Sequence, residues 1–142
     1  MREPYTDSEV SALLEQHGVS PTVQRVLITQ TLVNSGAHLT AEDVFQTVNK
    51  ESPGVSKATV YNTVGLLARK GVIREVVANP NKLFYDANTT PHHHFYDETT
   101  GELIDIDATD VRVTGLPPLP ENAELKSVDI VVRVTRHEKV KG

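Results

Sequence analysis

The sequence predicts an α+β protein in which four helices and a β-hairpin come first and a smaller β-rich part follows. Two observations support this prediction. Apolar residues recur at helical spacing in four segments before residue 72, and each segment opens on a residue type that caps helices. Beyond that point, short runs rich in β-branched and aromatic residues alternate with turn residues, a pattern typical of strands.

The four helices are predicted from their caps and their apolar faces. The expected caps are, in chain order, Thr6 or Asp7, Ser20 or Thr22, Thr40, and Ser56. Glu9 and Asp43 stand three residues after two of these caps and predict capping boxes, while Gly18 and Gly71 mark helix ends. The side chains expected to face the core are Val10, Leu13, Leu14 and His17, then Val23, Val26, Leu27 and Gln30, and finally Val60, Val64 and Leu67.

After the fourth helix the pattern changes from helical to strand-like. Residues 72–86 form two β-rich runs around the sequence Asn-Pro-Asn, which is turn chemistry. Helices followed by such a hairpin are the layout of a winged helix-turn-helix domain. Residues 56–70 would then form the second helix of the motif, the one that reads DNA.

A short polar stretch separates this part from the rest of the chain. Residues 87–91 (Ala-Asn-Thr-Thr-Pro) predict a hinge. The expected division is therefore residues 1–86, a hinge at 87–91, and residues 92–142. In the last part we expect strands at 92–97 and 102–107, one helical turn, a Pro-rich loop, and a final β-branched strand at 124–137.

Composition narrows the chemistry that the chain can perform. Because it has no cysteine, disulfides, thiolate zinc sites and thiolate haem ligation are excluded. A transition-metal site must use histidine and carboxylate, which suit Zn, Mn, Fe(II), Co or Ni. No apolar run approaches the roughly 20 residues of a membrane span, so we expect a cytoplasmic protein without a membrane partner. Although the net charge is −5, residues 52–82 hold five basic side chains and one acidic one.

The fourth predicted helix carries a candidate DNA-reading surface. Its first two turns expose Lys57, Thr59, Tyr61 and Asn62, at the end that enters the major groove in this motif. Tyr61 could meet a thymine methyl and a phosphate, and Asn62 could read adenine. Arg25 would hold a phosphate from the second helix. The alternative is a small helical bundle with a solvated fourth helix; the helix order, the hairpin and the local positive charge favour DNA binding.

Three consecutive histidines, His92 to His94, form the second candidate site. Alternate residues of a strand share a face, so His92 and His94 point one way and His93 the other. The residues that could complete a chelating set are Asp86, Asp105 and His38. There are three alternatives to a metal site of this kind. They are a polar edge strand, a haem site at the histidines, and a small metalloenzyme built on His92, His94 and a carboxylate. The last is disfavoured because the sequence has neither a Gly-rich phosphate loop nor a nucleophile elbow.

The motifs taken together resemble the ferric uptake regulator family along nearly the whole chain. The resembling segments are residues 18–25 (GVSPTVQR), 38–45 (HLTAEDVF), 56–73 (SKATVYNTVGLLARKGVI), 84–86 (FYD) and 92–105 (HHHFYDETTGELID). Within the family the chain looks most like the iron response regulator branch of alphaproteobacteria, which keeps a histidine triplet and lacks the zinc cysteines.

The resemblance implies a fold, a function and a set of site residues. It implies a winged-helix DNA-binding domain, a small α/β dimerisation domain, and a homodimer on a palindromic, A/T-rich operator. The implied function is metal-responsive, iron- or haem-linked regulation of iron-homeostasis genes, with a Mn(II), Zn(II) or peroxide-type sensor of the same family as the alternative. The implied interdomain metal ligands are His38, Asp86, His92, His94 and Asp105. The family's recognition tyrosine falls on Tyr61 and its clamp arginine on Arg25.

Several positions depart from the family pattern. Asp97 and Thr100 stand where the first pair of zinc cysteines would be, so no structural zinc held by four cysteines is expected. The auxiliary metal site keeps only His93, and Asn62 replaces the usual arginine after the recognition tyrosine. The Cys-Pro haem motif is absent, so any haem would use the run from His92 to His94.

Overall fold

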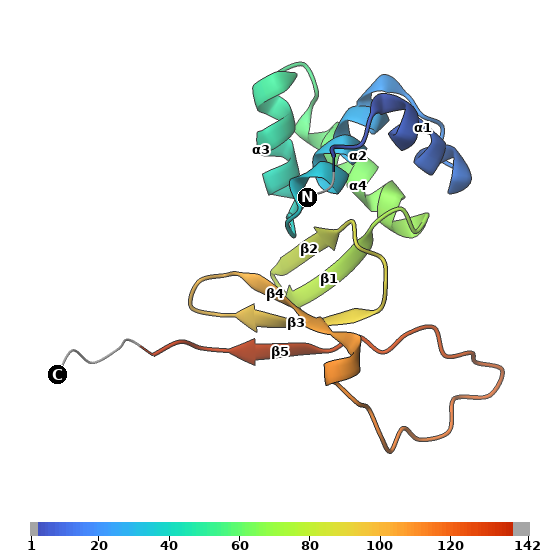
Figure 1. Ribbon diagram of the computed structural model, residues 1–142, viewed down its shortest axis with the longest axis vertical. Coiled ribbons are helices and arrows are strands. Elements are labelled where there is room, and N and C mark those ends of the chain that lie inside the picture. Colours follow the sequence, from blue (N-terminus) through green and yellow to red (C-terminus); the bar gives the residue numbers. More distant parts are fainter. Residues whose placement is uncertain (1–2, 138–142) are drawn as a thin grey trace. The chain divides into compact units, whose positions relative to one another are not determined.

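The computed structural model describes residues 3–137 and divides the chain into two compact units, with the division between Thr89 and Thr90. The division falls inside the polar stretch 87–91. Figure 1 traces the helices and strands of both units in chain order. Across the described residues, none of the helices combines the length and the hydropathy that a membrane span requires.

The first unit contains four helices and a hairpin, as the sequence predicts. Its elements are α1 (Asp7–Gln16), α2 (Val23–Ser35), α3 (Ala41–Glu51), α4 (Lys57–Arg69), β1 (Arg74–Asn79) and β2 (Lys82–Asp86). The four caps are Thr6, Thr22, Thr40 and Ser56, each accepting a backbone N–H three residues on. Both predicted capping boxes form, because the side chains at the third helical position return a bond to the cap.

The core of this unit confirms the predicted faces of α1 and α4 and corrects that of α2. Val10 and Leu14 are buried in α1, as are Val60, Val64 and Leu67 in α4. In α2 the prediction holds for Val26, which is buried, and for Leu27, which packs against the core, but it was wrong for Val23, which is 86% exposed. The buried side chains of α2 are Val26, Ile28, Thr29 and Leu32.

The buried threonine explains why the sequence pattern misled. Helix α2 contacts α1, α3 and α4, so a broad arc of it is covered. The Thr29 hydroxyl lies within that arc and donates to the carbonyl of Arg25, one turn earlier, at 2.7 Å. A hydroxyl satisfied in this way can be buried at little cost, yet a search for apolar spacing reads it as polar.

The hairpin is tied to the segment before α3. Strands β1 and β2 pair antiparallel, with an irregularity between Val77 and Asn79. Leu39 forms an isolated bridge with Tyr85 through two backbone bonds of 2.7 and 3.1 Å. This bridge fixes the chain on both sides of it, and so determines where the neighbouring residues of the two segments lie.

The second unit is a three-stranded mixed sheet. It contains β3 (His92–Asp97), β4 (Leu103–Asp107), one 3-10 turn η1 (Ala108–Asp110), and β5 (Val131–Val134). The central strand β3 pairs antiparallel with β4 and parallel with β5. The helical turn and the final strand confirm the sequence prediction, although the strand is shorter than the β-branched run. Residues 111–130 have no regular secondary structure.

Candidate metal-binding and nucleic-acid-binding sites

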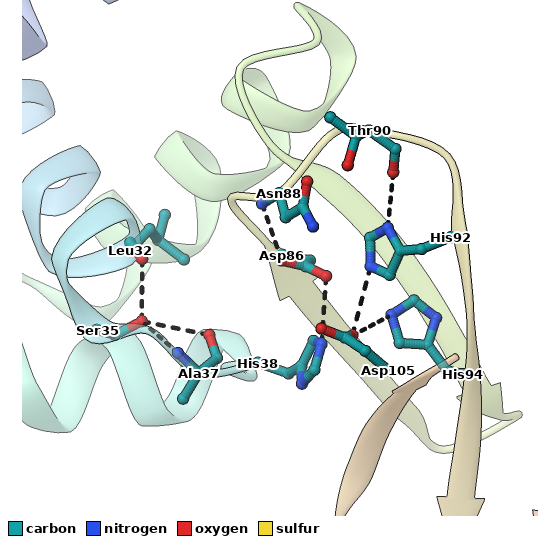
Figure 2. Close-up of polar contacts among 10 residues, drawn as sticks. All are labelled: Leu32, Ser35, Ala37, His38, Asp86, Asn88, Thr90, His92, His94 and Asp105. Atoms are coloured by element: carbon teal, nitrogen blue, oxygen red, sulfur yellow. Dashed lines mark hydrogen bonds and ion pairs between the residues drawn. The ribbon is translucent and has the colours of Figure 1, made fainter. Parts of the chain in front are cut away.

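In the first unit, His38 and Asp86 form a close pair. The Nε2 of His38 lies 3.2 Å from Oδ2 of Asp86, as Figure 2 shows. The antiparallel bridge between Leu39 and Tyr85 brings them together, since His38 directly precedes Leu39 and Asp86 directly follows Tyr85. The other oxygen of Asp86 accepts the backbone N–H of Asn88 at 2.9 Å, which orients the carboxylate.

In the second unit, one face of the β3–β4 pair gathers two imidazoles and a carboxylate. His94 stands directly opposite Asp105 in the strand register. Oδ1 of Asp105 lies 3.3 Å from Nε2 of His94 and 3.5 Å from Nε2 of His92 (Figure 2). The two rings meet edge to face, with centroids 4.5 Å apart. The predicted alternation of the histidines is therefore present in the structure.

The backbone sets the tautomer of His92. Its Nδ1 lies 2.6 Å from the carbonyl oxygen of Thr90. Because a carbonyl only accepts, Nδ1 must carry the hydrogen, which leaves the Nε2 lone pair directed to the side of Asp105. A backbone carbonyl behind the ring is the usual support of a metal-ligating histidine. Two imidazoles and a carboxylate supported in this way fit Mn(II), Fe(II) or Zn(II).

The middle histidine has a different task. Nδ1 of His93 accepts the backbone N–H of Ile130 at 3.2 Å, just before β5. In the neutral ring Nε2 then carries the hydrogen, so neither nitrogen of His93 offers a lone pair to a metal while this bond is in place. A haem iron could bind this ring only if the bond to Ile130 were lost. The geometry thus assigns His93 to the β3–β5 junction.

At the position of the missing zinc cysteines, the structure has an ion pair between a buried carboxylate and a largely exposed arginine. The side chain of Asp97 is fully buried and contacts Arg136, whose Nε donates to Oδ2. Oδ1 of Asp97 accepts the backbone N–H groups of Thr99 and Thr100 at 2.9 and 3.2 Å. The hydrogen bond from Arg136, followed by those from the two backbone groups, lowers the pKa of Asp97 below 3.8, although burial opposes this change.

Sequence reasoning missed Arg136. Its guanidinium makes the bond to Asp97, and its backbone N–H donates to the Thr99 hydroxyl at 3.0 Å. The run from Asp97 to Gly101 is a recognisable turn, since a short acidic side chain commonly accepts the N–H groups that follow it. No local pattern could identify an arginine 39 positions away as the partner.

The candidate DNA-reading residues differ in their surroundings. Lys57, Tyr61 and Asn62 are exposed on α4, whereas Thr59 is half-buried and its hydroxyl accepts from the Ser56 cap at 2.9 Å. Thr59 therefore supports the helix start. On α2, the guanidinium of Arg25 donates to the carbonyl of Ser20 at 3.2 Å.

Sequence reasoning also missed a residue beside this surface. Lys57 and Tyr61 both contact the carboxylate of Glu42, which projects from the first turn of α3. Nothing in the sequence distinguished Glu42 from an ordinary acidic residue at a helix N-terminus. It was found only because the structure shows which donors meet it.

Comparison with known proteins agrees with this arrangement. The model of the Ferric uptake regulator family matches residues 16–133. The peroxide-responsive repressor PerR of Staphylococcus aureus (strain USA300) is 33% identical over 97 residues, which are 68% of this chain and 66% of the relative, just under two thirds of its length. PerR of a second Staphylococcus aureus strain (NCTC 8325 / PS 47) matches to the same extent, so these relatives support the family without supporting its iron response branch.

Two solved structures share the fold. The Helicobacter pylori ferric uptake regulator, described as having three functional metal-binding sites, covers all of this chain with 99% of its own, at 19% identity and a TM-score of 0.70. The Pseudomonas aeruginosa regulator with manganese has the same TM-score at 23% identity, over 90% of this chain and 98% of its own. The family consists of transcriptional regulators and not of enzymes, which removes the metalloenzyme alternative. With its family model matched from residue 16 to residue 133, the chain belongs to the ferric uptake regulator family.

Proposed function

We propose that this chain is a metal-responsive transcriptional regulator of the cytoplasm that binds operator DNA as a homodimer. One observation carries the metal part of the proposal. His92, His94 and Asp105 converge on one face of a strand pair, and a backbone carbonyl holds His92 in the tautomer that a metal needs. Family membership supports the regulatory part.

We further propose that His38 and Asp86 ligate the same ion as His92, His94 and Asp105. The first pair offers two ligands and the second group three, whereas Mn, Fe(II) and Zn sites use about four to six. His92 follows Asp86 by six positions, so the chain limits the distance between their Cα atoms to about 20 Å. Ligands on both sides of the unit boundary would restrict how the DNA-binding unit moves against the other.

Such a restriction gives metal binding an effect on DNA affinity. A dimer reads two half-sites only when its recognition helices have the matching separation. His38 and Asp86 belong to the unit that carries α4, and the other ligands belong to the second unit. The protein then has two states, one in which all five side chains ligate the ion and one in which they do not. If the first state has the arrangement that fits the operator, metal binding favours it by the difference in metal affinity between the two states.

The homodimer proposal rests on the apolar surface of the second unit. Phe95 and Val132 are register partners on neighbouring strands, and both are exposed. Further exposed apolar residues of this unit are Val113, Leu116, Leu119, Leu125 and Val128. A small unit that exposes this many large apolar side chains favours a partner that covers them, and a second copy of the chain offers the same surface.

The bound metal is proposed to be Fe(II) or Mn(II), with Zn(II) as the alternative. A mixed imidazole and carboxylate set without thiolates suits the first two. Iron-linked control of iron-homeostasis genes follows from the resemblance to the iron response branch, whereas the similarity to PerR supports a peroxide-type sensor. Competitive loading of Fe(II), Mn(II) and Zn(II) onto purified protein would rank the metals.

DNA binding is expected to depend on two exposed side chains of α4. The probe is a DNA duplex that the wild-type protein enriches from a random pool. Tyr61→Ala and Lys57→Ala should each bind this duplex more weakly than wild type. For Tyr61, which is proposed to contact bases, the loss should be roughly ten- to a hundredfold. Lys50→Ala, which removes an equal charge from the last turn of α3, should have little effect. Fluorescence anisotropy with and without Mn(II) measures the affinities. If no duplex is enriched with Mn(II), with haem or without either, the regulator proposal is wrong.

Haem is the less favoured ligand of the histidine run. Because His93 offers no lone pair to iron while it accepts from Ile130, haem would have to use His92 or His94 and compete with the metal. We therefore expect His93→Ala to keep any Soret band of haem-loaded protein and His94→Ala to lose it. We also expect Mn(II) to displace haem. A Soret band that disappears in His93→Ala, while Mn(II)-dependent DNA binding survives, would instead establish a separate haem face.

A further inference from the structure

We infer that Glu42 is a specificity-determining residue, which positions Tyr61 so that its hydroxyl can only accept hydrogen bonds from DNA bases. The inference rests on the proposed function of DNA binding and extends it to the type of base group that Tyr61 reads. It comes from the contacts between the first turn of α3 and the first two turns of α4.

Three donors converge on the Glu42 carboxylate. Oε2 accepts from Nζ of Lys57 at 2.8 Å and from the hydroxyl of Tyr61 at 3.0 Å. Oε1 accepts from the side-chain amide of Gln46 at 2.9 Å, one turn further along α3. The Thr40 cap fixes the helix turn from which Glu42 projects. The Glu42 carboxylate is therefore oriented by Gln46 of its own helix α3, and it accepts hydrogen bonds from Lys57 and Tyr61 of α4.

The Glu42 side chain is a negatively charged carboxylate near neutral pH. The hydrogen bond from Lys57, then those from Gln46 and Tyr61, lower the pKa of Glu42 from 4.5 to about 2. The same contact raises the pKa of Lys57, which stays an ammonium. The Lys57 nitrogen also lies 5.6 Å from the centre of the Tyr61 ring, so the three side chains form one charged and aromatic group.

The direction of the Tyr61 hydrogen decides what it can read. A phenol has a single hydrogen, and Tyr61 donates it to Glu42. Its oxygen therefore offers only lone pairs to any further partner. Phosphate oxygens are also acceptors and cannot bond to it, whereas the amino groups of adenine and cytosine in the major groove are donors and can. The exposed ring of Tyr61 keeps its apolar face for a thymine methyl.

Glu42 also discourages binding that ignores sequence. Non-specific affinity comes mainly from the attraction between basic side chains and phosphates. A permanent carboxylate next to Lys57 offsets one such charge, whichever sequence is present. Binding then depends more on base contacts, so the ratio of specific to non-specific affinity rises.

The test compares Glu42→Gln with Glu51→Gln, an exposed residue at the end of the same helix that changes the net charge equally. The probes are a duplex enriched by the wild type and one of the same composition in shuffled order, measured by anisotropy at several salt concentrations with Mn(II). We expect Glu42→Gln to lower the affinity ratio of the two duplexes by about tenfold. Glu51→Gln should leave the ratio unchanged.

Two further measurements separate positioning from a general loss of charge. Tyr61→Phe should lower the ratio as well, and the double variant should lower it no further than the larger single effect, because both remove one contact. Burial, and after it the bond to Glu42, raise the pKa of Tyr61 in wild type. In the free protein, labelled tyrosine NMR should therefore show a lower Tyr61 pKa in Glu42→Gln, which removes the second cause.

The outcomes also distinguish this inference from the proposed function. If wild type enriches no duplex, DNA binding fails, and the regulator proposal fails with it. If wild type binds but Glu42→Gln matches Glu51→Gln, or its effect adds fully to that of Tyr61→Phe, the specificity role of Glu42 is wrong. An unchanged Tyr61 titration in Glu42→Gln would overturn the positioning itself, whatever DNA shows.

Discussion

Asp105→Ala is expected to abolish tight binding of Mn(II) or Fe(II) and to leave the fold in place. Its Oδ1 is the carboxylate atom that both His92 and His94 face, at 3.5 and 3.3 Å. Loss of a supporting partner behind a ligand costs metal affinity about 10- to 100-fold, so loss of a ligand should cost at least the upper figure. The Asp105 side chain is 55% exposed, and its removal opens no cavity in the core.

The measurement is metal affinity by calorimetry, paired with DNA affinity on the same preparation. Asp110→Ala is the matched control, because it removes an exposed carboxylate of η1 that lies only five residues away. In Asp105→Ala, added Mn(II) should no longer change DNA affinity, whereas Asp110→Ala should respond as wild type does. Metal binding of wild-type strength in Asp105→Ala would contradict the ligand assignment.

The His38→Ala variant tests whether one ion is shared between the units. If the ion takes ligands from both, His38→Ala should weaken metal binding as well as the response of DNA affinity, although His38 belongs to the DNA-binding unit. If His38→Ala binds metal as tightly as wild type does, His92, His94 and Asp105 hold their ion alone. The proposed link between metal and DNA affinity would then lose its physical basis.

The parts of the fold that the sequence predicted are those that local rules determine. Thr6, Thr40 and Ser56 cap their helices because the orphan N–H groups of a helix start need a nearby acceptor. The face of α2 was mispredicted in part, at Val23, Ile28 and Thr29, because α2 contacts three other helices whose positions its own sequence does not determine. A local pattern can show that a helix exists without showing which of its sides is covered.

The same distinction applies to the candidate site. Strand alternation was enough to separate His93 from its neighbours, and pairing of β3 with β4 was enough to suggest Asp105. The contacts of Glu42 and Arg136 join segments 19 and 39 residues apart, so spacing could not reveal them. The role of the five metal ligands stays a prediction, which the variants of Asp105 and His38 test.

Asp97→Asn is expected to destabilise the second unit markedly, and the effect should depend on pH. Asp97 is the only fully buried carboxylate among the described residues, and it joins the β3–β4 turn to the chain that follows β5 through Arg136. Asp97 accepts hydrogen bonds from Arg136 and from the backbone N–H groups of Thr99 and Thr100, and hydrogen bonds to a charged acceptor are stronger than those to a neutral one. Asparagine keeps the shape and one acceptor, so the lost charge is the main change.

The pH dependence has a definite sign. The pKa of Asp97 is lowered in the folded state below 3.8, its ordinary value, with the Arg136 bond as the main cause. The stabilisation is therefore fully present above the unfolded value and is lost as the pH falls through the folded one. Thermal unfolding followed by circular dichroism should show wild type and Asp97→Asn far apart near neutral pH and converging in strong acid.

A chelator tests whether the second unit is stabilised without a structural zinc. The Asp97–Arg136 pair could provide the cross-link that a cysteine-bound zinc would otherwise provide. The test uses the Asp105→Ala variant, in which the proposed regulatory metal site is already disrupted. If the ion pair replaces zinc, EDTA should not lower the unfolding temperature of this variant. Glu98→Gln, at the exposed neighbour of Asp97, is the control for loss of one acid and should unfold as wild type does. Equal unfolding temperatures for Asp97→Asn and Glu98→Gln at neutral pH would contradict a stabilising role for the ion pair. If Asp97→Asn has a much lower unfolding temperature than wild type, and EDTA leaves the unfolding temperature of Asp105→Ala unchanged, the buried carboxylate and the guanidinium stabilise this turn without metal.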